Sequence, residues 1–341
     1  MAWSSTSLEP ARKRAMQCLV VAGVLLVGTN CASRFWTQHP GAEGAVIYRS
    51  RGPVSPATAI ASSGRAQQAI GSEVSGRGKR TGQRIPRRIV MSYRVQDEIP
   101  PQIFELWHRL NPEWEMVFFD DATALRFIKK HFDRRHVRFF ESLTGKKQGA
   151  YRGDFFRYCY LLRRGGVWAD VDLRPLRPVE SFLHPEATFF SVAHTHNLKW
   201  NHVYQAYIGA VPGQPLLQAA IEAMIAAGPG LGIDFGLGPP YEGTPCTTLH
   251  KIVSAAIAPK KIVEGIFPSP GGLVQLLNQD QSNDPPEKTK CLRPGEPCSV
   301  CSGTTAVADC RYPASVWERD GVGFHKSALS KLDMQGGVAG S

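Results

Sequence analysis

The sequence of 341 residues contains no internal repeat and, outside its N-terminal part, no basic segment interleaved with aromatic residues. The first absence argues against a repeat architecture, and the second argues against a nucleic-acid partner. The formal net charge of +11 is concentrated near the N-terminus: residues 1–84 hold eleven Lys and Arg against three Glu, or +8, and residues 85–341 hold 29 basic and 26 acidic residues, or +3. The net charge therefore says little about the folded part.

A long uninterrupted apolar run is also missing. The densest apolar stretch, Cys18–Val27, follows the basic triplet at residues 12–14, and it is shorter than the ~20 residues that a membrane-spanning helix needs. This order is typical of a targeting segment. We favour a signal anchor over a cleaved signal peptide or a buried helix, and we expect a cytosolic tail and anchor at 1–36 that attach the protein to a membrane.

Composition divides the remainder of the chain. Residues 37–83 are rich in Gly, Ser, Ala, Pro and Arg without apolar periodicity, which predicts a flexible stem. The hydrophobic content of 43% is enough for a sizeable core. We therefore expect one folded catalytic domain at 84–330, followed by a tail at 331–341.

Alternating patterns at the start of this domain predict an α/β fold. A proline precedes a short apolar run in 84–94, which indicates a first core strand. Residues 99–111 place apolar side chains on one helix face and end at Asn-Pro, 114–121 are typical of a strand, and 122–132 are typical of a helix. This order favours a sheet of largely parallel strands.

The most informative block joins a helix to a strand through two glycines. Residues 149–164 predict a helix that stops at Gly165-Gly166, and "VWADVDL" predicts the strand that follows. On a strand Asp170 and Asp172 point to one side, where a divalent cation would relieve their repulsion. Asp154 and Arg157 share one helix face; they form either a surface ion pair or part of the same site. A solvated strand end is the alternative for the aspartates.

Later segments are less regular. We expect a strand at 188–194, then a strand, a turn and an amphipathic helix within 203–227, and a weaker strand at 261–269. Residues 228–250 are rich in glycine and proline.

Cysteines cluster near the C-terminus. Cys291, Cys298, Cys301 and Cys310 lie within twenty residues, and their spacing matches no strong zinc template, so we favour disulfides over zinc. Cys159 lies on the apolar side of the 149–164 helix, where a free buried thiol is expected.

A histidine and a lysine follow in "GVGFHKS", residues 321–327. His325 is either an ordinary loop histidine or an imidazole ligand for a cation such as Mn²⁺, and Lys326 could then neutralise phosphate.

Taken together, "RIPRRIVMSYR", "LNPEWEMVFFDD", "RGDFFRYCYLLRRGGVWADVDLRPL" and "YIGAVPGQPLL" resemble the DXD sugar transferases of glycosyltransferase family 32 over roughly residues 84–215. The resemblance implies a retaining transferase that moves a hexose from a nucleotide sugar to a glycan or glycoconjugate acceptor. It also implies a Rossmann-like sheet of the GT-A type. Trp168 replaces a tyrosine that is frequent in that family.

The resemblance assigns roles to individual residues. Asp170 and Asp172 would hold Mn²⁺, with Mg²⁺ as the alternative, and through it the donor diphosphate. Asp154 and Arg157 would bind the donor sugar, so Asp154, Arg157 and Asp172 are the catalytic candidates. Tyr93 would lie near the base. A cation clamped by carboxylates would stabilise the leaving diphosphate.

Two other functions compete with this one. A phosphatase of the haloacid dehalogenase type also uses D-x-D after a strand, but it needs an acidic pair downstream, and here Asp120-Asp121 precede the motif. A non-catalytic sugar-binding or scaffold protein on the same fold is the second alternative. In a eukaryotic host the anchor and stem would place the catalytic domain in the Golgi lumen; in a bacterium they would imply export or membrane attachment.

Overall fold

The computed structural model of the protein describes residues 36–40, 45–50, 83–144, 148–194, 202–229, 245–282, 284, 286–296 and 298–310. The chain falls into two compact units, one made of Met1–His39 and Tyr48–Ile70 and the other of Pro40–Ile47 and Gly71–Ser341. Two short strands, β1 (Trp36–Pro40) and β2 (Val46–Ser50), occur within or next to the range predicted as a stem.

Several predictions concern residues beyond this description. The core of the expected anchor, most of the stem, His325, Lys326 and the tail at 331–341 all lie outside the described residues. Among the residues that are described, no helix is both long enough and apolar enough to cross a membrane.

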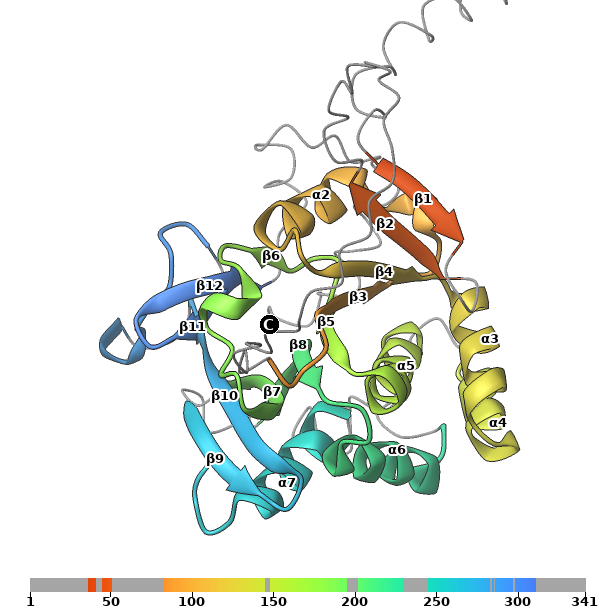
Figure 1. Ribbon diagram of the computed structural model, residues 1–341. Coiled ribbons are helices and arrows are strands. Elements are labelled where there is room, and N and C mark those ends of the chain that lie inside the picture. The colour runs from red at the N-terminus through yellow and green to blue at the C-terminus, as the bar shows by residue number, and fades with distance from the viewer. Residues whose placement is uncertain are drawn as a thin grey trace, which may run out of the picture. The chain divides into compact units, whose positions relative to one another are not determined.

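The first half of the second unit alternates between strands and helices as expected (Figure 1). Its elements are β3 (Arg88–Ser92), α2 (Pro101–Leu110), β4 (Glu115–Phe119), α3 (Asp121–His131), α4 (Arg134–Ser142), α5 (Gly149–Arg164) and β5 (Gly166–Ala169). A short 3-10 helix, η2 (Gln96–Glu98), lies between β3 and α2. The predicted bounds of α5 agree with the structure. Helix α4 was not predicted, although Asp133 caps it by accepting hydrogen bonds from the backbone N–H groups of Arg135 and His136.

The second half adds strands on the far side of β5. Its elements are β6 (Arg174–Pro175), η3 (Val179–Ser181), β7 (Ala187–His194), β8 (His202–Ala210), α6 (Pro215–Ala227), α7 (Pro245–Ile257), β9 (Gly265–Ser269), β10 (Gly272–Gln281), η4 (Pro286–Lys288), β11 (Cys298–Ser302) and β12 (Thr305–Asp309). Strands β7, β8 and β9 and helix α6 were predicted. Helix α7 and strands β10 to β12 were not.

One mixed sheet runs through this unit in the order β4-β3-β5-β8-β7-β10-β11-β12-β6, and β9 pairs with β10. Strand β3 is parallel to β4 and β5, and β7 is parallel to β10. Strand β8 is antiparallel to both β5 and β7. The expectation of a largely parallel sheet is therefore wrong. The short connection between β7 and β8 favours antiparallel pairing, because parallel neighbours need a long crossover.

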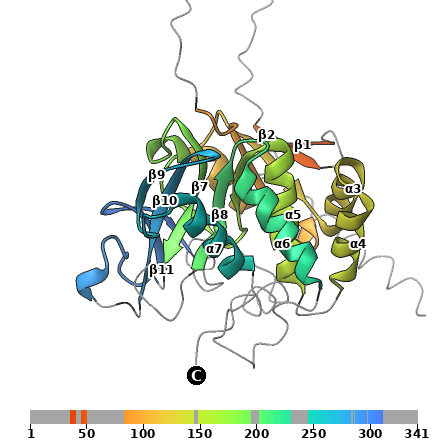
Figure 2. The ribbon, with the colours of Figure 1, turned by 90° about the horizontal axis from the view of Figure 1, so that it is seen from below.

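Aromatic side chains fill the core next to β5. The ring centroid of Phe119 on β4 lies 5.0 Å from that of Phe156 and 5.2 Å from that of Tyr160, both on α5. Phe156 also packs edge-on against Trp168 of β5 at 5.9 Å. Helices α5, α6 and α7 lie side by side along this core (Figure 2). The packing holds α5 and β5 in a fixed relation, since closely packed rings resist displacement.

Two disulfides join the four cysteines near the C-terminus, and they confirm the expectation of disulfides in place of zinc. They join Cys291 to Cys301 and Cys298 to Cys310, with Cα–Cα distances of 5.8 Å and 5.2 Å. Cys159 is buried and free, as expected.

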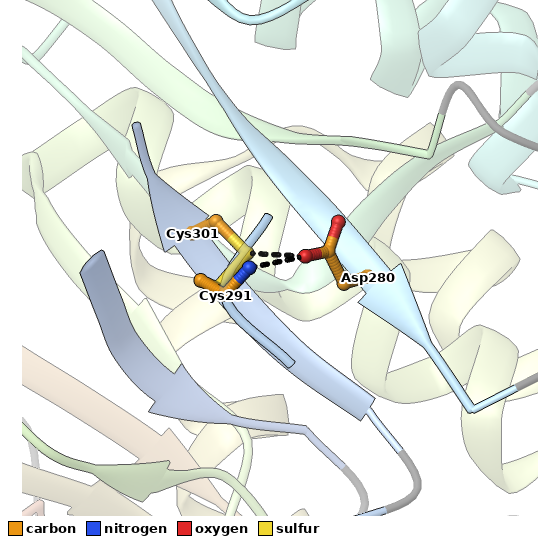
Figure 3. A group of neighbouring side chains, drawn as sticks. All are labelled: Asp280, Cys291 and Cys301. Carbon is orange, nitrogen blue, oxygen red and sulfur yellow. Dashed lines mark hydrogen bonds between the residues drawn. A yellow bond between two sulfur atoms is a disulfide. The ribbon is translucent and has the colours of Figure 1, made fainter. Parts of the chain in front are cut away.

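The buried carboxylate of Asp280 on β10 lies against the first of these disulfides (Figure 3). Its Oδ2 accepts hydrogen bonds from the backbone N–H groups of Lys290 at 2.6 Å and Cys291 at 2.7 Å, and it lies 3.2 Å from Cys301 Sγ. Asp280, Cys291 and Cys301 have the spacing of metal ligands. Because both sulfur atoms are joined in a disulfide, however, neither is available as a thiolate, and the carboxylate instead anchors the backbone of the cross-linked segment.

Candidate functional site

The junction between α5 and β5 brings the helix and the strand close together. The backbone N–H of Gly165 donates to Leu161 O at 2.8 Å and closes the last turn of α5. Gly165 and Gly166 have φ angles of 65° and 115°, which favour glycine. A Cβ atom at Gly166 would lie 2.9 Å from the carbonyl oxygen of Arg88. The glycine pair therefore permits both the sharp turn and the close approach of β5 to β3.

Strand β5 ends at Ala169, earlier than the sequence predicts. The backbone N–H of Asp170 still donates to Ala206 O on β8 at 2.9 Å, and the N–H of Leu173 then donates to Asp170 O at 3.0 Å. This second bond turns the chain, so Asp170 and Asp172 stand in a turn and not on a strand. Both aspartates are half-buried, while Val171 and Leu173 between and after them are buried. In this turn half-buried aspartates alternate with buried apolar residues, as they would on a strand.

Arg157 joins helix α5 to this turn. One of its guanidinium nitrogens lies 3.3 Å from Asp154 Oδ1 and 2.9 Å from Asp170 Oδ1. The Arg157 side chain is only 7% exposed, so the alternative of a surface ion pair is wrong. A buried guanidinium needs such partners, because an unpaired buried charge is costly. Asp154, Arg157 and Asp170 therefore form one charged cluster.

Burial sets the electrostatics of this cluster. Desolvation raises the pKa of Asp154 to about 6, the positive charge of Arg157 opposes that rise, and the negative charge of Asp170 adds to it. Burial is thus the largest of three causes. A carboxylate with a raised pKa beside a specific charged partner is typical of a functional site.

Tyr93 lies at the same edge of the sheet as the turn. It directly follows β3, and its backbone N–H donates to Phe119 O at 3.1 Å. Strands β3 and β5 are parallel with Val90 opposite Trp168. Because these strands are parallel, the residues after β3 and those after β5 both lie at the carboxyl edge of the sheet. Ligands of open α/β sheets bind at this edge.

The oxygen atoms at this edge fit a hard divalent cation. Asp170 uses Oδ1 for its contact with Arg157, and within the described ranges its Oδ2 accepts no hydrogen bond. Asp172 adds a second half-buried carboxylate two residues later. Carboxylate oxygens are the donors that Mn²⁺ and Mg²⁺ take. His325 and Lys326, the other predicted members of the site, lie outside the described residues.

Sequence reasoning missed one member of the site. The indole N–H of Trp168 donates to Asp170 Oδ1 at 2.7 Å. Side chains two residues apart on a strand share one side, so the spacing of Trp168 and Asp170 could have indicated this contact.

Comparison with known proteins finds a similarity over the segment that holds this site. Residues 100–190, from α2 to the middle of β7, match the family model described as "Glycosyltransferase sugar-binding region containing DXD motif". The match covers Asp154 and Arg157 on α5 and both aspartates of the turn, Asp170 and Asp172. It confirms the resemblance to DXD glycosyltransferases.

A curated relative and a solved structure give more particular similarities. The chain is 25% identical over 126 residues to the initiation-specific alpha-1,6-mannosyltransferase of Schizosaccharomyces pombe, a match that covers 33% of this chain and 32% of the relative. The matched region thus spans about a third of that relative's length. The solved structure of PaToxG glycosyltransferase covers 51% of this chain and 70% of its own, at 12% identity and a TM-score of 0.38.

Proposed function

We propose that the protein is a metal-dependent retaining glycosyltransferase that moves a hexose from a nucleotide sugar to a glycan or glycoconjugate acceptor. One observation carries the proposal: Arg157 joins Asp154 and Asp170 at the carboxyl edge of β5, inside the segment that matches a DXD sugar-binding region. The Rossmann-like, GT-A type arrangement belongs to the same proposal. Its support is that β4, β3 and β5 are parallel and end at the edge where these residues gather.

The residues divide the work between the two halves of the donor. Asp170 and Asp172 would hold Mn²⁺ or Mg²⁺, which when bound supplies a Lewis acid that balances the charge of the leaving diphosphate. Asp154 and Arg157 bind hydroxyl groups of the donor sugar and fix the ring for attack by the acceptor. Tyr93 lies near the base, and His325 and Lys326 serve the metal and the phosphate.

The way the carboxylates are engaged bears on the route by which the configuration is retained. A retaining glycosidase needs one carboxylate as a nucleophile that faces an acid across the bond at ~5 Å. Here Asp154 and Asp170 both pair with Arg157, so neither is presented as an independent nucleophile. A retaining reaction at this site would then proceed by attack of the acceptor on the same face that the diphosphate leaves.

The disulfides bear on the compartment. Cys291–Cys301 and Cys298–Cys310 are bonds that persist in oxidising surroundings. They support a catalytic domain that has crossed a membrane: in the Golgi lumen behind a type II signal anchor in a eukaryote, or exported or attached to the membrane in a bacterium.

Donor binding can be tested with the full chain. Thermal stability is followed against a panel of nucleotide sugars, each with and without Mn²⁺, for the unsubstituted chain and for Asp172→Asn. GDP-mannose comes first, because the relative from Schizosaccharomyces pombe is named as a mannosyltransferase; UDP-glucose, UDP-galactose and UDP-N-acetylglucosamine follow. A donor at a hundred times its dissociation constant stabilises the folded state by about 3 kcal/mol.

We expect metal-dependent stabilisation by one nucleotide family, lost in Asp172→Asn and retained in the control Asp97→Asn. Asp97 is an exposed aspartate of η2 to which the proposal assigns no role, so its substitution makes the same chemical change without touching an assigned residue. Sugar transfer should fall about a hundredfold in Asp172→Asn, the usual cost of one preorganised charge contact. Donor binding without transfer to any acceptor would favour the non-catalytic alternative. The absence of any stabilisation in the folded chain would refute the proposal.

A further inference from the structure

One oxygen atom of Asp170 accepts two hydrogen bonds from buried donors. Trp168 Nε1 donates to Oδ1 at 2.7 Å, and Arg157 donates to the same atom at 2.9 Å. Trp168 is 1% exposed and Arg157 is 6% exposed. Hydrogen bonds to charged acceptors are stronger than neutral ones, and both donors here are shielded from water. The carboxyl group of Asp170 is thereby held at one of its two oxygens.

Trp168 is the more rigid of the two donors. Its backbone is paired on both sides, with Val90 of β3 and Ile208 of β8. Its ring packs edge-on against Phe156 and lies under the guanidinium group of Arg157, whose central carbon is 5.3 Å from the ring centroid. A central strand and a filled aromatic core leave the indole no alternative rotamer of low energy. Its N–H therefore points in a fixed direction.

The other oxygen of Asp170 has a different environment. The side chain is 32% exposed, and within the described part of the chain Oδ2 accepts no hydrogen bond. A guanidinium offers several donors in one planar fork, so it can serve either carboxylate oxygen or both at once. A single indole N–H cannot, so it distinguishes Oδ1 from Oδ2.

We infer that Trp168 is a positioning residue of the donor site: its N–H fixes the rotation of the Asp170 carboxyl group, so that Oδ1 stays with the protein and Oδ2 faces the cation. The inference rests on the proposed function for the identity of that ligand. Trp168 does not touch the metal; it acts on metal binding only through Asp170.

The first test measures the affinity for Mn²⁺ alone, from the electron paramagnetic resonance signal of the free ion, in the full chain. We expect Trp168→Phe to weaken binding about tenfold, or ~1.4 kcal/mol. Trp114→Phe, at another buried tryptophan outside the site, should leave the affinity within about twofold. If Trp168→Phe folds poorly, replacement of Trp168 by the isosteric benzothienylalanine removes the N–H and preserves the ring volume.

A double-mutant cycle separates positioning from general damage. In the background of Asp170→Asn, the change at Trp168 should cause no further loss of Mn²⁺ affinity, because the group through which it acts has changed. The same tenfold loss in both backgrounds, or no loss in either, would overturn the inference.

Stability provides the readout that does not depend on the metal. The urea midpoint should fall more when Trp168 is changed in the unsubstituted chain than when it is changed in Asp170→Asn. If the unsubstituted chain binds no Mn²⁺, the metal part of the proposed function fails, and the role toward the cation falls with it. If the urea midpoint falls equally in both backgrounds, the hydrogen bond from Trp168 does not fix Asp170, and the inference itself is overturned.

Discussion

Replacing Asp154 by asparagine tests the electrostatics of the site, because the substitution removes a charge that burial makes unfavourable. The side chain is 15% exposed, and burial raises its pKa from 3.8 to about 6. A rise of that size corresponds to about 3 kcal/mol. A carboxyl group that holds its proton more tightly when folded stabilises the folded state fully at pH below its unfolded pKa, and this contribution is lost as the pH rises through about 6.

Asparagine carries no charge at any pH, so Asp154→Asn escapes the loss that the unsubstituted chain suffers as the pH rises. Between pH 5 and pH 8 the free energy of unfolding of the variant should improve relative to that of the unsubstituted chain by about 1.5 kcal/mol. The attraction between the ionised Asp154 and Arg157 is already contained in the pKa of about 6, so it needs no separate allowance.

The assay is urea denaturation of the full chain at both pH values, in EDTA so that no cation neutralises the carboxylates. The exposed Asp97→Asn again serves as the control for the chemical change itself. A pH-independent difference for Asp154→Asn would show that the pKa of Asp154 is not raised. A difference of opposite sign would show that attraction by Arg157 outweighs burial.

Three further changes test the frame around the site, each by urea or thermal denaturation. Gly166→Ala should destabilise the fold by more than about 1 kcal/mol, because a φ of 115° and the carbonyl of Arg88 both exclude a Cβ atom; an unchanged midpoint would contradict that account. Asp120→Ala should cost about 1 kcal/mol, since Asp120 caps α3, and a neutral result would mean that water replaces the cap. Replacing both Cys298 and Cys310 by serine should cost about 3 kcal/mol and remove part of the sensitivity to thiol reductants; equal stability with and without the bond would refute its contribution.

Local chemistry makes some elements of this fold predictable. Helix α5 begins and ends as expected because arginines in its last turn and a glycine with positive φ just beyond it are strong signals. Strands β3 and β4 and helices α2 and α3 follow from apolar periodicity of adequate length. The same signals placed Asp154, Arg157, Asp170 and Asp172 in one segment.

Strand β10 shows why other elements escaped prediction. It buries Gln275, Asn278, Gln279 and Asp280, so its sequence lacks the alternation of apolar and polar residues that indicates a strand. Some of these side chains bond to partners far along the chain; Gln275, for example, accepts from the backbone N–H of His184 and donates to Phe182 O. A buried polar strand is stable only where such partners meet it, and no local pattern records them.

The sequence by itself determined the helix–glycine–strand block, its four charged residues and the cysteines that pair, because capping, periodicity and spacing act over a few residues. Only the tertiary structure decided that β8 lies antiparallel beside β5, that the strand yields to a turn at Asp170, and that Trp168 shares this carboxylate with Arg157. Those outcomes depend on which strands become neighbours and on which donors burial brings together. Both arise from packing between segments that are remote in the chain.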